Sequence, residues 1–156
     1  MFNAEQLREL IIRPALNELI AYSDSALELM TFTCAVESEG GTYLKQIKGP
    51  ALGIYQMEPN TYNDIWQNYI KSNHSLLLQL LSNFGVINMP SEDRLIYDLK
   101  FATAMTRIHY LRVNSPLPQA SDIDAIWDYY KEHYNTINGA ATKNVSIAKY
   151  QAFLKA

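Results

Sequence analysis

The chain has 156 residues, 48% of them hydrophobic, which suffices for one compact core but not for two ordinary domains. Its formal net charge of −3 provides no electrostatic attraction for nucleic acid or for an anionic membrane surface. We therefore expect a single domain over 1–156, with no nucleic acid among its partners.

The first half of the chain begins with two helical patterns. Residues 4–22 carry apolar side chains near helical spacing, with Pro14 as a candidate kink. Residues 25–38 are apolar on nearly every face, which is typical of a buried helix. Either Ser23 or Asp24 provides the N-cap of that second helix.

The segment 42–57 has no helical period, so we expect a loop or a small hairpin there. Further helices are expected over 59–71, 75–84, 91–112, 123–134 and 145–154. The sequence therefore predicts an all-α fold, in which residues 1–23 form an N-terminal helix packed on the rest of the domain.

Glu37 lies in the last turn of the buried helix, and the following Gly40-Gly41 pair is expected to supply the left-handed residue that ends it. Apolar neighbours and the negative end of the helix dipole both raise the pKa of a carboxyl group. A carboxylic acid that stays protonated near neutral pH is suited to general acid catalysis. Glu37 is therefore the candidate general acid, although a solvated glutamate at a helix end is the simpler alternative.

A glycine-punctuated segment follows Glu37-Ser38 in the chain and reads Ala51-Leu52-Gly53-Ile54-Tyr55-Gln56, then Pro59-Asn60-Thr61. Together these pieces resemble the signature of the lytic-transglycosylase branch of the lysozyme-like superfamily. That signature has a catalytic Glu followed by Ser, a Gly-Ala-x-Gly-Leu-x-Gln segment and a Pro-x-Thr helix start. The chain departs from it by placing Pro50 after the first glycine, by a longer loop and by Ile54 in place of Leu.

The second half of the chain is similar to small phage-encoded lysozyme-like proteins. The similarity lies in the run 98–112, the Leu117-Pro118 break and the segment 127–142. Within it, Tyr134-Asn135 takes the place of an Ala-Tyr-Asn motif, with His133 where Ala is usual. The resemblance covers about 24–142 and implies a single lysozyme-like domain that acts on peptidoglycan, either in a phage virion or in the host cell, with its substrate in the periplasm.

The resemblance assigns roles to several side chains. Glu37 is the catalytic acid, and the expected substrate-binding residues are Ser38, Tyr55, Gln56, Tyr134 and Asn135. Ser38 could instead orient Glu37 or be a plain polar group at the helix end, and for Tyr55 and Gln56 the alternative is ordinary half-buried packing. The Tyr134 hydroxyl either holds Glu37, stabilises charge on the sugar or belongs to the core. Glu58 is a possible second carboxylate, or else a capping group for the helix that opens at Pro59.

The implied reaction uses Glu37 first as acid and then as base, and it forms a 1,6-anhydro ring on N-acetylmuramic acid.

No cofactor or metal is expected, because the histidines lack metal-ligand spacing. Cys34, the single cysteine, is expected to be a buried hydrophobe. No secretory signal peptide and no membrane-spanning stretch is expected, so the route to the cell wall lies elsewhere.

Three other functions are compatible with the sequence. A true lysozyme would add water and use Glu58 as its second carboxylate. A virion structural or wall-binding protein would keep the fold with little catalysis, since fold does not fix function. An intracellular helical adaptor would use the aromatic helix over 123–134 as a partner groove, which leaves Glu37 and the glycine segment unexplained.

Overall fold

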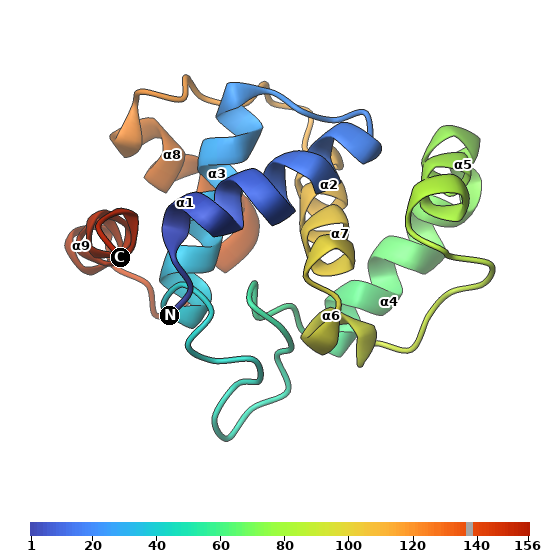
Figure 1. Cartoon of the computed structure of the whole chain (residues 1–156), viewed down its shortest axis with the longest axis horizontal. Helices are drawn as coiled ribbons and strands as arrows, with labels where there is room; N and C mark the ends of the chain where they lie inside the picture. Colours follow the sequence, from blue (N-terminus) through green and yellow to red (C-terminus); the bar gives the residue numbers. More distant parts are fainter. Residues whose placement is uncertain (137–138) are drawn as a thin grey trace.

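The computed structural model describes residues 1–136 and 139–156, and within them the fold is all-α, as predicted (Figure 1). The helices in chain order are α1 (Ala4–Leu7), η1 (Arg8–Ile12), α2 (Arg13–Glu18), α3 (Asp24–Ser38), α4 (Pro59–Asn68), η2 (Ile70–Ser72), α5 (His74–Asn83), α6 (Arg94–Tyr97), α7 (Leu99–Leu111), α8 (Ile123–Tyr130), η3 (Lys131–Asn135) and α9 (Lys143–Leu154). The buried helix α3 lies at the centre, in contact with η1, α7, α8 and α9.

The N-terminal helix continues through Pro14 by means of a π-helical turn. In η1 the Arg13 N–H donates to the Arg8 carbonyl, five residues back, rather than to a carbonyl four residues back. Proline has no N–H to donate and its ring crowds the preceding turn, so a wider turn just before Pro14 accommodates the ring. The predicted helix over 4–22 therefore ends at Glu18 in α2 and contains a π-turn near its middle.

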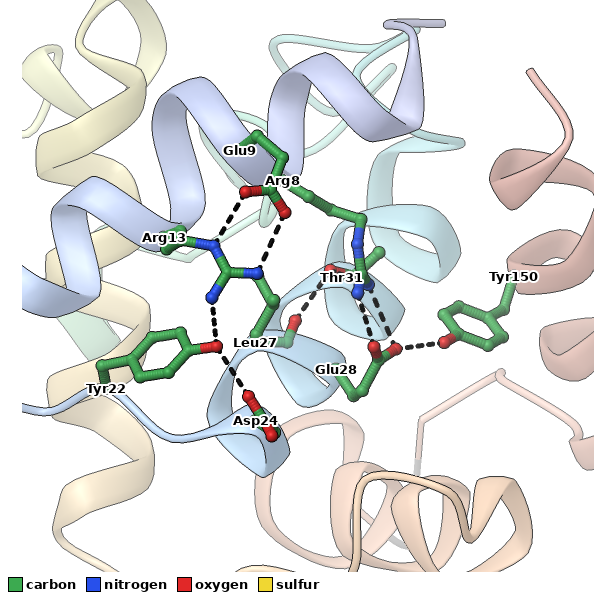
Figure 2. Close-up of polar contacts among 9 residues, drawn as sticks. All are labelled: Arg8, Glu9, Arg13, Tyr22, Asp24, Leu27, Glu28, Thr31 and Tyr150. Carbon is green, nitrogen blue, oxygen red and sulfur yellow. Dashed lines mark hydrogen bonds and ion pairs between the residues drawn. The ribbon is translucent and has the colours of Figure 1, made fainter.

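A polar network ties both ends of the chain to α3 (Figure 2). Glu28 of α3 accepts from Arg8 of η1 at 2.5 Å and also from the Tyr150 hydroxyl of α9. Arg8 donates to the Thr31 hydroxyl at 3.0 Å as well. Because Arg8 and Glu28 are mostly buried, this pair fixes the N-terminal and C-terminal helices against the same face of α3.

A second set of contacts holds the turn that leads into α3. Arg13 pairs with Glu9 at 2.8 Å and also donates to the Tyr22 hydroxyl, which in turn donates to Asp24 at 2.7 Å (Figure 2). Ser23 is the N-cap of α3 and accepts from the Ala26 N–H at 3.0 Å.

The C-terminal end of α3 differs from the prediction at one residue. Glu39, with φ of 51°, is the first left-handed residue, and Gly40 and Gly41 continue with φ of 63° and 84°. The N–H groups of Glu39 and Gly40 both reach the Cys34 carbonyl. Gly40 allows close packing, because a Cβ there would lie 2.4 Å from the ring of the buried Phe153. The helix thus ends immediately after Ser38 and leaves Glu37 in its last turn.

The loop after α3 folds back on itself, as expected for 42–57. Isolated antiparallel bridges join Lys45 to Leu52 and Leu52 to Met57. The described residues form no sheet. Gly53 is the tightest point, since a Cβ there would lie 2.1 Å from the Leu95 carbonyl oxygen and its φ is +77°. The loop is therefore pressed against the backbone of α6.

The helix predicted over 91–112 is broken in the structure. Asp98 adopts an extended conformation and its side chain accepts from the Phe101 N–H at 2.9 Å, so it ends α6 and caps α7. An aspartate that bonds the backbone two or three residues ahead competes with helix continuation. The helix predicted over 123–134 likewise changes to a π-turn, η3, from Lys131 to Asn135.

None of the described helices combines the length and the apolar character that crossing a bilayer requires.

Candidate active site

Three adjoining hollows meet at the side chain of Glu37. One hollow of about 470 Å³ opens toward α9 and is lined by Tyr130 and Lys149. A second, of about 330 Å³, lies beside η3 and is lined by Gln56, Glu58 and His109. A third of about 200 Å³ opens toward the loop residues Tyr43 and Ile47. The last helical turn of α3 therefore presents Glu37 at the junction of an extended groove.

Tyr130 of α8 holds the Glu37 carboxyl in place. Its hydroxyl donates to Glu37 Oε1 at 2.6 Å. Tyr130 is fully buried, with its ring edge-on to Phe32 of α3 and stacked with Tyr134 one helical turn later. Burial first, and then the neighbouring Glu37, raises the pKa of Tyr130, so this hydroxyl stays protonated and remains a donor.

The environment raises the pKa of Glu37, chiefly because burial disfavours the ionised carboxylate. The hydrogen bond from Tyr130, the charge of Lys149 and the Asn135 amide each act in the opposite direction and limit the rise. The direction agrees with the sequence prediction, and the cause is desolvation. The carboxyl is only partly exposed, yet it faces the groove and remains accessible from it.

The Tyr134 hydroxyl makes no hydrogen bond to Glu37, a role that the sequence left open. Its hydroxyl donates to the backbone carbonyl of Tyr55 at 2.5 Å and so connects η3 to the glycine-punctuated loop. The Tyr55 ring is buried and its hydroxyl bonds the Thr103 hydroxyl at 2.8 Å. Tyr55 is therefore a packing residue in this structure, and the prediction that its side chain contacts substrate is corrected.

Ser38 is also buried rather than open to the groove, which corrects its predicted contact with substrate. Its hydroxyl donates to the Ile54 carbonyl at 2.6 Å and accepts from the Gly41 N–H at 2.9 Å. Ser38 thus fastens the end of α3 to the loop. A small hydroxyl residue next to Glu37 serves here to position the two segments that form the groove.

Gln56 and Asn135 line the same hollow as Glu37, and their predicted contact with substrate stays a prediction. Gln56 borders two of the hollows, has a φ of 50°, and donates through its side-chain amide to the Gly53 carbonyl at 2.9 Å. A non-glycine residue at positive φ is strained and is found more often at functional sites. Asn135 accepts from Lys131 at 2.7 Å, and its amide favours the ionised form of Glu37.

Glu58 is exposed and lines the same hollow as Glu37. It occupies the N-cap position of α4, but its side chain makes no capping hydrogen bond. Its carboxylate lies at the positive end of α4, where a negative charge is favourable, and it also borders the groove, so the structure is compatible with both predicted roles.

The sequence did not identify Tyr130 or His109 as site residues. Tyr130 is four residues before Tyr134, so the two lie on the same helical face. This spacing is the sequence feature that could have identified Tyr130. His109 lines the groove from α7, accepts from Arg112 at Nδ1 (2.8 Å) and donates from Nε2 to the His133 carbonyl at 3.2 Å.

We expect His109 to make the fold sensitive to acid. Burial, together with the Arg112 charge, lowers the pKa of His109 from 6.5 to about 4, while the His133 carbonyl and Asp64 oppose the shift. The unfolded chain then binds a proton that the folded chain does not, so stability is lost as pH falls from 6.5 to about 4. The loss is on the order of 3 to 4 kcal/mol at most, at ~1.4 kcal/mol per pKa unit.

Urea unfolding of the wild type and of His109→Gln, measured at several pH values across this window, tests the expectation. Glutamine can still donate to the His133 carbonyl but does not titrate. The stability difference between variant and wild type should therefore change with pH, in favour of the variant in acid. A difference that stays constant would assign the acid sensitivity to other groups.

Among the described residues, no cluster of three His, Cys, Asp or Glu side chains has the arrangement of a metal site. Cys34 is buried, and desolvation raises the pKa of its thiol to about 12, so it packs as a hydrophobic residue.

No known protein family, curated protein or solved structure matches this chain.

Proposed function

We propose that this chain cleaves the β-1,4 bond between N-acetylmuramic acid and N-acetylglucosamine in peptidoglycan, as a lytic transglycosylase with Glu37 as its acid and base. The observation that carries the proposal is the Glu37 carboxyl itself. It lies where three hollows join, its pKa is raised by burial, and Tyr130 fixes one of its oxygens. An extended groove suits a polymeric glycan better than a compact substrate.

In the proposed reaction, the protonated Glu37 carboxyl gives its proton to the glycosidic oxygen as the bond from muramic C1 breaks. The positive charge that develops at C1 is stabilised by the acetamido oxygen of the same sugar. Glu37, now a carboxylate, removes the proton from the C6 hydroxyl, whose oxygen closes on C1 as the 1,6-anhydro ring. No water is consumed, and Glu37 ends in its starting state.

Two neighbours have defined parts in this scheme. Tyr130 donates to the oxygen Oε1, which leaves the other carboxyl oxygen to carry the transferred proton. Gln56 borders both hollows on the loop side and presents an amide to the sugar hydroxyls. The setting that the resemblance implies is a phage virion or an infected host cell, with the periplasmic cell wall as substrate.

A hydrolytic lysozyme is the second candidate, because Glu58 lies in the same hollow as Glu37. There Glu58 would activate water or form the glycosyl intermediate, as in two-carboxylate glycosidases. The two candidates differ in their products, which makes them separable by one experiment.

The test is mass spectrometry of muropeptides released from purified sacculi. The transglycosylase proposal expects fragments that end in anhydromuramic acid, and it expects Glu58→Gln to release the same fragments. Reducing ends that carry an added water, together with loss of release in Glu58→Gln, would establish hydrolysis. Sacculi that are bound but not cleaved by the wild-type chain would instead indicate a structural or wall-binding protein.

A further inference from the structure

A second cavity, separate from the Glu37 groove, is built around Arg107 of α7. It has a volume of about 460 Å³ and lies between the turn before α3, the start of α5 and α7. No described residue lines both this cavity and the hollow beside η3. The separation follows from the helix, because Arg107 and His109 are two residues apart and point to different faces of α7.

Arg107 differs from the other arginines in its charge environment. Of the five arginines in the chain, Arg8, Arg13, Arg94 and Arg112 each pair with a carboxylate. Arg107 is only 8% exposed, and within 1–136 and 139–156 it has no carboxylate at ion-pair distance. Its Nε donates to the Ala21 carbonyl at 3.1 Å. A buried guanidinium without a counter-ion is unfavourable, and burial accordingly lowers the pKa of Arg107.

The rest of the cavity wall adds positive potential and no described acidic side chain. Ser23 and Asn73, which line it, are the N-caps of α3 and α5, so the positive ends of two helices face the same space. Ser75 contributes a hydroxyl from the first turn of α5. The two acids adjacent to lining residues in the sequence, Glu18 and Asp24, lie outside the lining. Glu18 pairs with Lys100 at 2.5 Å, and Asp24 accepts from the Tyr22 hydroxyl.

We infer that this cavity binds an oxyanion, a carboxylate or a phosphate group, with Arg107 as its charge partner. A guanidinium presents paired N–H donors that match either group. Leu19, Leu76 and Tyr69 form the apolar part of the wall, which suits a small organic anion better than a bare inorganic ion. The inference does not depend on cleavage at Glu37.

The experiment is a titration of the full chain with four probes: benzoate, phenylphosphate, acetate and inorganic phosphate. Binding is monitored by NMR and by thermal melting. Sodium chloride is the control for ionic strength. Saturable shifts of the Ser23, Asn73 and Ser75 amides are expected, with tighter binding of the aromatic probes. The preference between benzoate and phenylphosphate distinguishes carboxylate from phosphate as the natural group.

Arg107→Met should weaken this binding at least ~10-fold, the size expected when a charged hydrogen-bonding partner is lost. Arg112→Met is the matched control, since Arg112 pairs with Asp64 at 2.7 Å and does not line the cavity. The inference would be overturned if Arg107→Met bound the probes as tightly as the wild type does. It would also be overturned if no probe bound the wild type saturably.

A second variant keeps the test informative if Arg107→Met does not fold. Ser75→Asp places a carboxylate in the cavity, in the first turn of α5 where an acid is favourable. This internal anion should raise Tm and weaken probe binding at the same time. Unchanged probe binding in Ser75→Asp would contradict an anion site at Arg107.

Discussion

Replacing Glu37 with glutamine is expected to reduce the release of muropeptides from sacculi by at least ~10²-fold, the usual contribution of a general acid. Glutamine cannot donate the proton that the leaving oxygen needs. It can still accept from the Tyr130 hydroxyl, which donates to Glu37 Oε1 at 2.6 Å in the wild type, so the groove should keep its shape. The loss should therefore appear in the rate of cleavage, with binding to sacculi retained.

The same variant should be more stable than the wild type at neutral pH. Burial raises the pKa of Glu37, so the contribution of this group to stability is fully present below the unfolded pKa and is lost as pH rises through the folded pKa. Glutamine carries no charge and avoids that loss. Thermal melts between about pH 4 and about pH 8 should show the Glu37→Gln advantage growing as pH rises.

Glu39→Gln is the matched control for both measurements. Glu39 is two residues further along, exposed, and pairs with Lys149 at 3.4 Å, outside the hollows that meet at Glu37. We expect it to retain cleavage. If Glu37→Gln digested sacculi at the wild-type rate and was destabilised at every pH, Glu37 would be a structural carboxylate and the proposed function would fall.

Replacing Gly53 with alanine is expected to cause a large loss of stability, although the substitution adds only one methyl group. A Cβ at Gly53 would lie 2.1 Å from the Leu95 carbonyl oxygen, and this oxygen belongs to backbone that is itself packed. The φ of +77° adds the strain of a left-handed residue. Overpacking costs about 1–3 kcal/mol and the left-handed conformation about 1–2 kcal/mol, so a loss of about 3 kcal/mol is expected.

Gly85→Ala separates the two contributions. Gly85 has a similar φ of +62°, but no atom lies within 4 Å of a Cβ built there. It should show the conformational cost alone, about 1–2 kcal/mol. Urea unfolding of both variants measures the difference. Equal losses would mean that the loop moves away from Leu95 readily and that Gly53 is not the contact that positions it.

Gly53→Ala should also impair cleavage beyond its effect on stability. The loop carries the Tyr55 carbonyl, which accepts from Tyr134 at 2.5 Å, and Gln56, whose side-chain amide donates to the Gly53 carbonyl at 2.9 Å. A displacement of the backbone at Gly53 would move both the Tyr55 carbonyl and the Gln56 side chain. Activity measured well below the melting temperature of the variant isolates this effect from unfolding.

Local signals in the sequence were sufficient for most helix positions. Ser23 caps α3, Pro59 opens α4 and Asp122 caps α8 by accepting from the Ala125 N–H at 3.0 Å. The apolar run over 25–38 predicted the buried central helix, and its end predicted that Glu37 would be partly desolvated. These features depend on residues within one or two helical turns, so sequence spacing carries them.

The tertiary structure alone decided which side chains face the groove. Tyr130 and Tyr134 lie on one helical face, and the way α8 packs on α3 gives Tyr130 the contact with Glu37 and Tyr134 the contact with Tyr55. Ser38 is next to Glu37 in the chain, yet successive residues of a helix point about 100° apart, so it is buried against Ile54 while Glu37 faces the groove. The break at Asp98 is local by contrast, because its side chain caps α7 and ends a helix that the apolar periodicity would have continued. The sequence by itself determined the helices and the desolvated carboxyl, since these are local. The partners of that carboxyl depend on helix rotation and packing between segments up to 93 residues apart, which no local pattern specifies.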